Sequence, residues 1–314
     1  AIHSVVFAGF SAKSLSDRIN DATCKLLITA DGGFRGDKTT PLKEISDEAM
    51  KSTPSIERCI VLKRTKSNIN MQKNRDFWWH EQMENSNSDC PIEIMDSEDP
   101  LFILYTSGST GKPKGIQHST AGYMIYTEYS FRNVFQYEDG DIYWCTADIG
   151  WITGHSYIVY GPLLAGATTV MFEGTPSYPD AGRFWKIIEE NQINIFYTAP
   201  TAIRALEAKG MEFVTPYDLS SLKVLGTVGE PINEDAWHWY NKEIGKDNCP
   251  IVDTWWQTET GGIMISNLAN VTPAKPSFAT LPLPGIQPCL VNEKGNELEG
   301  NSVEGRLCIK FPWP

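Results

Sequence analysis

The stretch Leu101-Phe-Ile-Leu-Tyr-Thr-Ser-Gly-Ser-Thr-Gly-Lys-Pro-Lys-Gly115 joins an apolar run to a loop rich in glycine, hydroxyl groups and lysine. The apolar part predicts a buried strand. In the loop, three glycines allow close approach and unusual backbone angles, the hydroxyls can donate to phosphate oxygens, and Lys112 and Lys114 add positive charge. We interpret this loop as a polyphosphate cradle that follows a strand.

The loop differs from the Walker pattern, since Gly108 and Gly111 are too close together and Pro113 follows the lysine. An ordinary Gly/Ser loop is the alternative. Eleven residues of this composition directly after an apolar strand favour the phosphate-binding interpretation.

Further strand-like and helix-like runs alternate on both sides of this loop. The strand-like runs are 4–10, 25–29, 58–62, 101–105, 142–146, 168–172, 193–198, 223–228 and 251–256. The helix-like runs are 14–22, 120–135, 182–191, 200–209 and 234–244. This alternation predicts an α/β fold with mostly parallel sheets flanked by helices, in which ligands gather at the carboxyl ends of strands.

Local signals refine this plan. Pro200 is expected near a helix start, and Gly210 and Gly245 at left-handed helix ends. The polar stretch 81–96 predicts a surface loop. After Gly262 the pattern changes to short strands with a turn at Asn292–Asn296, so we expect an α/β core over 1–261 and the start of a β-rich subdomain over 262–314.

Composition excludes several classes of protein. The chain has 314 residues, 41% of them hydrophobic, which is enough for a sizeable core. Its net charge of −12 and its scattered Lys and Arg residues argue against nucleic-acid binding. Seven widely spaced cysteines without a C-x-x-C pair indicate reduced thiols in a cytoplasm-like compartment; we expect the cytoplasm, with the nucleus or an organelle as alternatives.

Residues 149–172 contain no formally charged side chain, which raises the alternative of a membrane span. The stretch also contains Pro162, His155, four glycines and several hydroxyl residues. We therefore expect a buried helix followed by a buried strand and no membrane anchor.

Three further segments carry chemistry, and each follows or adjoins a predicted strand. Asp253-Thr-Trp-Trp-Gln-Thr-Glu-Thr-Gly-Gly262 places a polar set beside paired tryptophans, which is costly in a core unless the polar groups bind something. In Val228-Gly-Glu-Pro231, the glycine would let a flat ring approach the backbone. In Thr146–His155, the histidine could act as a general base or, as we favour, in packing or gating.

The loop at 105–115 resembles the phosphate loop of the adenylate-forming superfamily of acyl-CoA synthetases, adenylation domains and luciferases. The motif Trp255-Trp-Gln-Thr-Glu259 resembles that of the acetyl-CoA synthetase branch. The resemblance extends over essentially the whole chain, which would correspond to the large N-terminal domain of such an enzyme. It implies ATP, Mg²⁺ and CoA as ligands, catalytic roles for Thr106, Lys112 and Glu259, and Glu259 as the metal ligand.

The resemblance also implies three sets of binding residues. The ATP-binding set is Thr106, Ser107, Gly108, Ser109, Thr110, Gly111, Lys112, Lys114, Gly229, Glu230, Pro231, Asp253, Thr254, Trp255, Trp256, Gln257 and Thr258. The acetate pocket is Ile152, Thr153, Val228 and Trp256. The CoA-binding set is Phe7, Ala8, Gly9, Arg35, Gly36, Asp37, Lys38, Thr153, Ser177 and Ala199. The family usually has Val at the position of Ile152, Arg at that of Lys38 and Asn at that of Ser177.

The implied reaction has two steps: acetate and MgATP give acetyl-adenylate and pyrophosphate, and the CoA thiol then displaces AMP. Trp256 would close the acyl pocket and exclude longer acids. The family also uses a ribose-binding Asp, nearby Arg residues and a lysine on a mobile C-terminal domain, none of which has a counterpart here, so we expect no turnover by this chain alone. The alternatives are a propionyl-CoA synthetase or other short-chain acyl ligase, and a non-catalytic nucleotide-binding domain; no oligomeric state follows from the residues.

Overall fold

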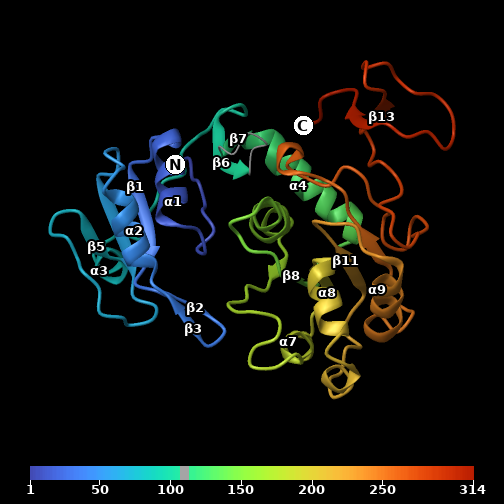
Figure 1. Ribbon diagram of the computed structural model, residues 1–314, viewed down its shortest axis with the longest axis horizontal. Helices are drawn as coiled ribbons and strands as arrows, with labels where there is room; N and C mark the ends of the chain where they lie inside the picture. The colour runs from blue at the N-terminus through green and yellow to red at the C-terminus, as the bar shows by residue number, and fades with distance from the viewer. Residues whose placement is uncertain (107–112) are drawn as a thin grey trace. The chain divides into compact units, whose positions relative to one another are not determined.

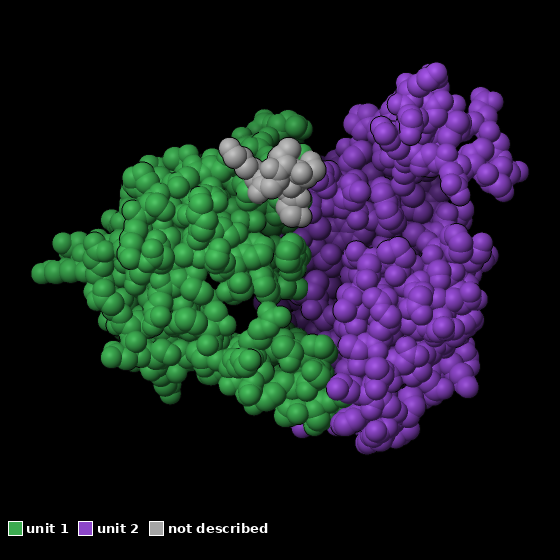
Figure 2. All heavy atoms as spheres, viewed as in Figure 1, with its two compact units in different colours: residues 1–120, 148–151, 172–183 green, residues 121–147, 152–171, 184–314 purple. Residues whose placement is uncertain are grey.

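The computed structural model describes residues 1–106 and 113–314, and the chain divides into two compact units (Figures 1 and 2). The first unit comprises residues 1–120, 148–151 and 172–183, and the second comprises 121–147, 152–171 and 184–314. Both units combine parallel strands with helices. The predicted α/β class is therefore confirmed, whereas the expected boundary at residue 262 stays a prediction.

The first unit is built on a parallel sheet of order β1-β4-β5. These strands are β1 (Leu26–Ala30), β4 (Arg58–Leu62) and β5 (Asp76–Trp78). The side chains of Cys59 and Val61 on β4 are fully buried on one face of this sheet. The strands expected at 25–29 and 58–62 are thus confirmed.

The other face of this sheet remains open to solvent. The register pairs Leu26 with Arg58, and Ala30 with Leu62, so these residues share a face with Ile28. Leu26, Ile28 and Leu62 are 47%, 58% and 43% exposed. Parallel sheets in α/β proteins are ordinarily covered on both faces, so this apolar surface is unusual.

The remaining elements of the first unit are local. The hairpins are β2 (Gly33–Arg35) with β3 (Lys38–Thr40), and β6 (Pro100–Thr106) with β7 (Lys114–Ser119). The helices are α1 (Ala12–Ala22), α2 (Leu42–Met50) and α3 (Trp79–Glu84). Helix α3 takes up the start of the stretch predicted as a loop at 81–96, which corrects that prediction.

The strand predicted over 4–10 is wrong. The chain turns there instead, with the amide of Phe10 donating to the carbonyl of Phe7, and Ser11 then caps α1 by accepting from the amide of Ser14 at 3.2 Å. The aromatic side chains pack on one another, with ring centroids of Phe7 and Phe10 5.7 Å apart and those of Phe7 and Trp151 6.0 Å apart. These apolar residues therefore serve ring packing and not strand pairing.

The second unit contains a parallel sheet of order β12-β11-β10-β8-β9. Its strands are β8 (Ile142–Cys145), β9 (Thr168–Thr169), β10 (Ile195–Thr198), β11 (Val224–Thr227) and β12 (Ile251–Asp253). Every residue of β10 and β11 is buried, as expected for strands covered on both faces. The strand predicted at 168–172 shortens to two residues.

Helical elements precede, connect and follow these strands along the chain. They are α4 (Thr120–Phe135), α5 (Ile152–Gly154), π-helix η1 (His155–Tyr160), α6 (Gly161–Leu164), α7 (Arg183–Asn191), α8 (Pro200–Glu207), α9 (Glu234–Trp239) and π-helix η3 (Tyr240–Ile244), with 3-10 turns η2 (Met211–Phe213) and η4 (Thr258–Thr260). Among the described residues, no helix has the length and apolar character that crossing a bilayer requires.

Antiparallel pairing follows in the later part of this unit. Strands β13 (Pro288–Val291) and β14 (Arg306–Ile309) form a two-stranded ribbon. The turn expected at Asn292–Asn296 is present, with the amide of Asn292 donating to the carbonyl of Asn296 at 2.9 Å. Gly210 has a positive φ of 100°, as expected, but its ψ of 161° is not that of a left-handed helical residue. Gly245 has φ −79°, because the residues with positive φ fall one and two positions later, at Lys246 and Asp247.

Candidate functional site

Several predicted site segments begin where strands of the second unit end. Ala199 follows β10, Val228 to Pro231 follow β11, and Thr254 to Thr258 follow β12. Because parallel strands present their carboxyl ends at one edge of a sheet, the three segments lie along the same edge. The structure therefore brings Ala199 and the predicted residues 228–231 and 254–258 to one sheet edge.

Hydroxyl groups join neighbouring strand ends along this edge. Oγ1 of Thr146 lies 2.6 Å from Oγ1 of Thr198, which links β8 to β10. Oγ1 of Thr227, at the end of β11, donates to Oδ1 of Asp253 at 2.8 Å. The strand ends are thus held by side chains as well as by the backbone ladder.

Asp253 is buried at the end of β12 and is 6% exposed. Burial raises the pKa of its carboxyl above the ordinary value, and the hydrogen bond from Thr227 opposes that shift. Next in sequence, Thr254 donates to the carbonyl of Thr227 at 2.8 Å and lies 2.6 Å from the hydroxyl of Tyr197. Burial raises the pKa of Tyr197 well above its ordinary value, so this phenol stays neutral and serves as a hydrogen-bond partner.

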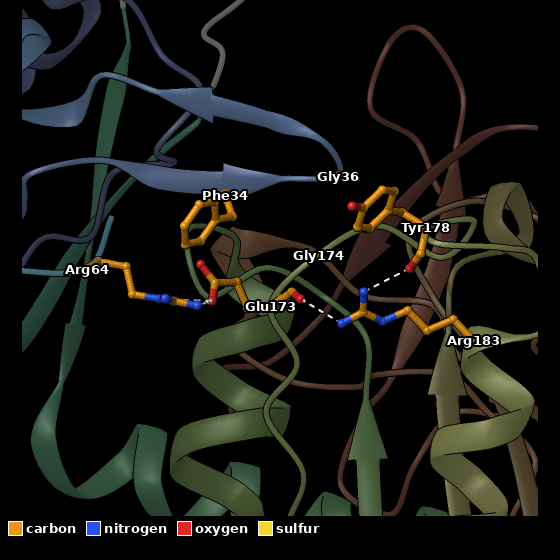
Figure 3. Close-up of a pocket in the computed structure, with 7 residues that line it drawn as sticks. All are labelled: Phe34, Gly36, Arg64, Glu173, Gly174, Tyr178 and Arg183. Atoms are coloured by element: carbon orange, nitrogen blue, oxygen red, sulfur yellow. Dashed lines mark hydrogen bonds and ion pairs between the residues drawn. The ribbon is translucent and has the colours of Figure 1, made fainter. Parts of the chain in front are cut away.

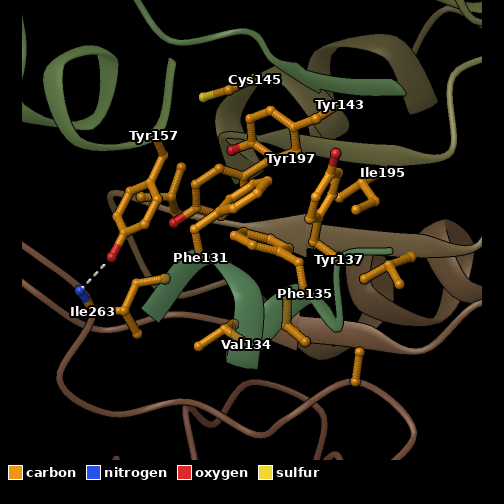
Figure 4. Close-up of a cluster of buried hydrophobic side chains, with 14 of the residues drawn as sticks. Phe131, Val134, Phe135, Tyr137, Tyr143, Cys145, Tyr157, Ile195, Tyr197 and Ile263 are labelled. Carbon is orange, nitrogen blue, oxygen red and sulfur yellow. Dashed lines mark hydrogen bonds between the residues drawn. The ribbon is translucent and has the colours of Figure 1, made fainter. Parts of the chain in front are cut away.

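An aromatic cluster lies behind the predicted acyl pocket. Tyr157 and Tyr197 belong to a buried core (Figure 4). Val228 is part of the same core, and Trp256 packs against it. The rings of Tyr157 and Trp256 meet edge to face with centroids 5.0 Å apart. Tyr157 is fixed in turn, because its hydroxyl accepts from the amide of Ile263 at 2.8 Å.

Ile152 and Thr153 belong to the short helix α5, directly before η1, which carries Tyr157. Ile152 is buried at 9% exposure. His155, at the start of η1, is 2% exposed, which favours the packing role over a general base.

Glu259, the predicted metal ligand, is exposed on the short turn η4. The turn is fixed by two bonds: the amide of Gln257 donates to Oγ1 of Thr260 at 2.9 Å, and the indole of Trp313 donates to the carbonyl of Thr260 at 2.9 Å. Across residues 1–106 and 113–314, no three His, Cys, Asp or Glu side chains are grouped so that they could hold a metal ion. A divalent cation here would rely on Glu259 together with ligand oxygens and water, which suits Mg²⁺.

The loop after β11 is anchored to helix α8. Gly229 has φ 95°, and a Cβ built on it would meet no heavy atom within 4 Å, so the space beside its backbone is open. Glu230 accepts from both the amide and the hydroxyl of Thr201 and pairs with Arg204 at 3.0 Å. The Thr201 hydroxyl bond and the Arg204 pair lower the pKa of Glu230 below its ordinary value. Glu230 thereby satisfies an orphan amide in the first turn of α8, whose N-cap, Ala199, has no capping side chain.

The predicted CoA-side residues Phe7, Ala8, Gly9, Arg35, Gly36, Asp37, Lys38 and Ser177 lie in the first unit. The guanidinium of Arg35 lies 5.7 Å from the ring centroid of Phe7. Gly9 sits against the same ring, since a Cβ there would come within 2.4 Å of it. Gly36, with φ 65°, lies at the tip of the β2–β3 hairpin, where an added Cβ would be 3.8 Å from the side chain of Tyr178, next to Ser177. Thr153 and Ala199, the other two predicted CoA contacts, belong to the second unit.

Beside this hairpin the first unit has a pocket of about 270 Å³ (Figure 3). Its lining residues are Phe34, Gly36, Arg64, Glu173, Gly174, Tyr178 and Arg183. Arg64 forms an ion pair with Glu173 and lies over the ring of Phe34 at 4.7 Å. Arg183 donates to the carbonyls of Tyr178 and Glu173, at 2.8 and 3.1 Å. Two guanidinium groups therefore border a cavity next to the predicted Arg35–Lys38 contacts.

Only the borders of the predicted phosphate loop can be placed. Thr106 ends β6 and pairs with Lys114, which begins β7. The predicted residues Ser107, Gly108, Ser109, Thr110, Gly111 and Lys112 lie outside the described residues.

Sequence reasoning missed several residues that organise the sheet edge. Tyr157 and Tyr197 appear in the sequence only as members of apolar runs, and Thr201 and Arg204 only as parts of a helix. One signal was available: the predicted strands ending near 146, 198 and 227 each reach a threonine there. A hydroxyl at the carboxyl end of several successive parallel strands indicates a polar edge.

Comparison with known proteins matches the family model "AMP-binding enzyme" over residues 1–313. Acetyl-coenzyme A synthetases of Rubrobacter xylanophilus, Desulfatibacillum aliphaticivorans and Rhodopirellula baltica are 59%, 58% and 57% identical to the chain over 314 residues. The match covers all of this chain and 49%, 48% and 47% of those proteins, so the chain spans about half the length of these curated relatives.

The chain belongs to the family of AMP-binding enzymes. Within that family it is similar to acetyl-coenzyme A synthetases along its whole length. The resemblance inferred from residues 105–115 and 255–259 is confirmed at this level.

Proposed function

We propose that these 314 residues form the nucleotide- and acyl-binding part of an AMP-forming acetate–CoA ligase. The observation that carries the proposal is the single sheet edge on which Val228–Pro231 and Asp253–Thr258 follow neighbouring strands, with side-chain hydrogen bonds between the strand ends. The family match and the similarity to acetyl-coenzyme A synthetases support it.

In the proposed first step, a carboxylate oxygen of acetate attacks the α-phosphorus of ATP, and the bond to the β-phosphate oxygen breaks to release pyrophosphate. Bound Mg²⁺ would neutralise charge on the phosphate oxygens, and the carboxylate of Glu259 would be the protein ligand of that ion. Thr106, Lys112 and Lys114 would hold the phosphates. The open space beside Gly229 would admit the adenine, and Trp255 would flank it from the other side.

In the proposed second step, the sulfur of CoA attacks the acyl carbon of the adenylate and AMP leaves. Phe7, Arg35 and Lys38 would contact the CoA nucleotide, since Arg and Lys suit phosphate recognition. We further propose that turnover depends on segments beyond the half of the relatives that this chain matches, and that the protein acts in the cytoplasm. The propionyl-CoA ligase and the non-catalytic nucleotide-binding domain remain the competing functions.

The test is thermal stabilisation of the chain by non-hydrolysable alkyl esters of AMP, comparing ethyl with butyl, with and without Mg²⁺. A ligand that binds only the folded state raises the melting temperature. We expect the ethyl ester to stabilise and the butyl ester to do so much less, because forcing extra methylenes against Trp256 costs about 1–3 kcal/mol, roughly five- to 150-fold in affinity.

Trp256→Ala should restore stabilisation by the butyl ester, whereas Trp237→Ala, which removes an indole on α9, should leave the preference unchanged. Equal stabilisation by a propyl and an ethyl ester would favour the propionyl enzyme. Stabilisation by AMP alone, with no added effect of either ester and none of Mg²⁺, would favour the non-catalytic nucleotide-binding domain.

A further inference from the structure

The ribbon formed by β13 and β14 carries two cysteines directly opposite one another. The strands are antiparallel, and their register pairs Cys289 with Cys308. Opposed residues of antiparallel strands project to the same face, with Cβ atoms about 4.5–5.5 Å apart. The two thiols therefore share one face of the ribbon.

The hydrogen-bond ladder fixes the kind of position that the pair occupies. The amide of Lys310 donates to the carbonyl of Gln287 at 2.9 Å. This bond joins the residues next to Pro288 and Ile309, so Pro288–Ile309 is a non-hydrogen-bonded pair. Hydrogen-bonded and non-hydrogen-bonded pairs alternate along an antiparallel ladder, so the next pair, Cys289–Cys308, is hydrogen-bonded, with Cα atoms about 5.5 Å apart. Disulfides join Cα atoms about 4.4–6.8 Å apart. The backbone is thus already within disulfide range.

The surroundings favour reaction at these two sulfurs. Cys308 is exposed and Cys289 is half-buried, so an oxidant in solvent reaches Cys308 first. Cys289 stands directly opposite Cys308 in the ribbon, so its sulfur is placed to react with an oxidised Cys308.

Most of the other cysteines are poor competitors. Cys59, Cys145 and Cys249 are buried, and burial raises the pKa of their thiols to about 12, about 12 and about 11. Cys24 is half-buried and burial raises its pKa as well. Cys90 is exposed but lies outside the β13–β14 ribbon, so it is the control for a solvent-accessible thiol without an opposed cysteine.

We propose that Cys289 and Cys308 are a redox-modification site that closes to an intramolecular disulfide in the presence of hydrogen peroxide. The thiolate of Cys308 attacks one peroxide oxygen, the O–O bond breaks, and the departing hydroxide takes a proton and leaves as water, so Cys308 becomes a sulfenic acid. The thiolate of Cys289 then attacks that sulfur, the S–S bond forms, and the S–O bond breaks with loss of a second water. Two thiols lose two electrons and the peroxide gains them.

This modification is independent of the proposed ligase activity, because it rests on the register of β13 and β14 and on the exposure of the cysteines. An exposed disulfide belongs to the class that a small thiol reduces readily. We therefore expect the bond to open again in dithiothreitol.

The experiment uses the whole 314-residue chain. The protein is treated with hydrogen peroxide, remaining thiols are blocked with N-ethylmaleimide, and tryptic peptides are analysed by mass spectrometry. The expected result is a linked pair of peptides containing Cys289 and Cys308 that separates after reduction. Blocking reagent on both residues, or preferential linkage of either one to Cys24 or Cys90, would overturn the proposal.

Single serine variants test the order of events. In Cys289→Ser, Cys308 should stop at the sulfenic acid and react with dimedone, and in Cys308→Ser, Cys289 should remain a thiol. Cys90→Ser should leave the linked pair unchanged, and its loss in that variant would contradict the proposal. The disulfide linkage is mapped first in the chain without substitutions. A folding defect in one of the variants therefore does not affect that test.

Discussion

The hydroxyl of Tyr197 lies 2.6 Å from Oγ1 of Thr254, which connects β10 to the segment after β12 with β11 between them. Thr254 already uses its single proton to donate to the carbonyl of Thr227. The phenol of Tyr197 is therefore the donor of the shorter bond. This bond ties the start of the predicted nucleotide-binding segment to β10, a strand in which every residue is buried.

Tyr197→Phe should lower the free energy of unfolding by about 1–2 kcal/mol, because a buried acceptor loses its partner while the ring stays in place. The measurement is urea unfolding followed by tryptophan fluorescence. Tyr240→Phe is the matched control: it also removes a buried phenol, but that hydroxyl donates to the carbonyl of Phe196 at 3.4 Å, a weaker bond. Equal losses in the two variants would contradict the role given to Tyr197.

Asp31 should stabilise the first unit in a pH-dependent manner. Its Oδ1 accepts from the amides of Gly32, Arg64 and Thr65, each at 2.8 Å, and its Oδ2 accepts from the amide of Ser67 at 3.1 Å. Burial alone would raise the pKa of this carboxyl, but the backbone donors outweigh it and hold the pKa below the ordinary value. The stabilisation is then present above the unfolded-state pKa and lost as the pH falls through the folded-state pKa.

Asp31→Asn should therefore cost about 2–3 kcal/mol at pH 7, since hydrogen bonds to a charged acceptor are lost. The gap between variant and parent should narrow as the pH falls below about 4. Chemical unfolding at several pH values measures both effects. Asp37→Asn, at an exposed position of the neighbouring hairpin, should have little effect at any pH. A pH-independent gap would rule out the charge as its cause.

Asp253 should show the opposite pH dependence. Because burial raises its pKa, the folded state holds the proton more tightly than the unfolded state, and ionisation costs stability as the pH rises above about 4. Relative to Asp253→Asn, the parent should lose stability between pH 4 and pH 7. Parallel pH profiles of the two proteins would refute this expectation, and Asp235→Asn on the exposed part of α9 is the control.

Glu230 should matter more as a helix cap than as an ion-pair partner. Its pair with Arg204 is more than a third exposed, so Arg204→Ala should cost less than about 1 kcal/mol. Glu230→Ala removes the acceptor for the amide of Thr201 and should cost about 0.5–2 kcal/mol, as other lost caps do. Thermal melting compares the two variants.

Glu207→Ala, at the other end of α8, is the matched control and should be neutral or slightly stabilising, because a negative charge is unfavourable at a helix carboxyl end. If the proposed adenine site is correct, Glu230→Ala should also weaken stabilisation by the AMP esters. A larger loss from Arg204→Ala than from Glu230→Ala would reverse the assignment.

Much of the fold was accessible from local sequence pattern. The helix at Thr120–Phe135 and the strand at Arg58–Leu62 have the predicted bounds. In the strand, a short continuous run of apolar residues carries the signal. Helix α2 was missed, since it begins after Pro41 without a capping side-chain bond and buries polar residues such as Lys43 and Ser46. A buried Lys43 is intelligible only from its partners Asp47 and Asp76, at 2.7 and 2.9 Å.

The candidate site, too, could be predicted only in part from local sequence pattern. That Gly229 lies at the end of a strand could be read from the sequence, because turns after parallel strands have recognisable residues. Trp256 was expected within a strand at 251–256, but β12 ends at Asp253 and Trp256 follows it. The contacts of Tyr157 with Trp256, and of Glu230 with Thr201, join residues that are far apart along the chain. No local period encodes such pairings, which follow from the order of strands in the sheet.

The open face of the β1–β4–β5 sheet has a practical consequence for anyone handling this chain. Leu26, Ile28 and Leu62 present adjoining aliphatic groups to water. In addition, β1 is an outermost strand of its sheet. Such surfaces promote adsorption and self-association. We expect the purified chain to enhance the fluorescence of an apolar dye such as ANS and to stay dispersed better when Ile28 is replaced by lysine.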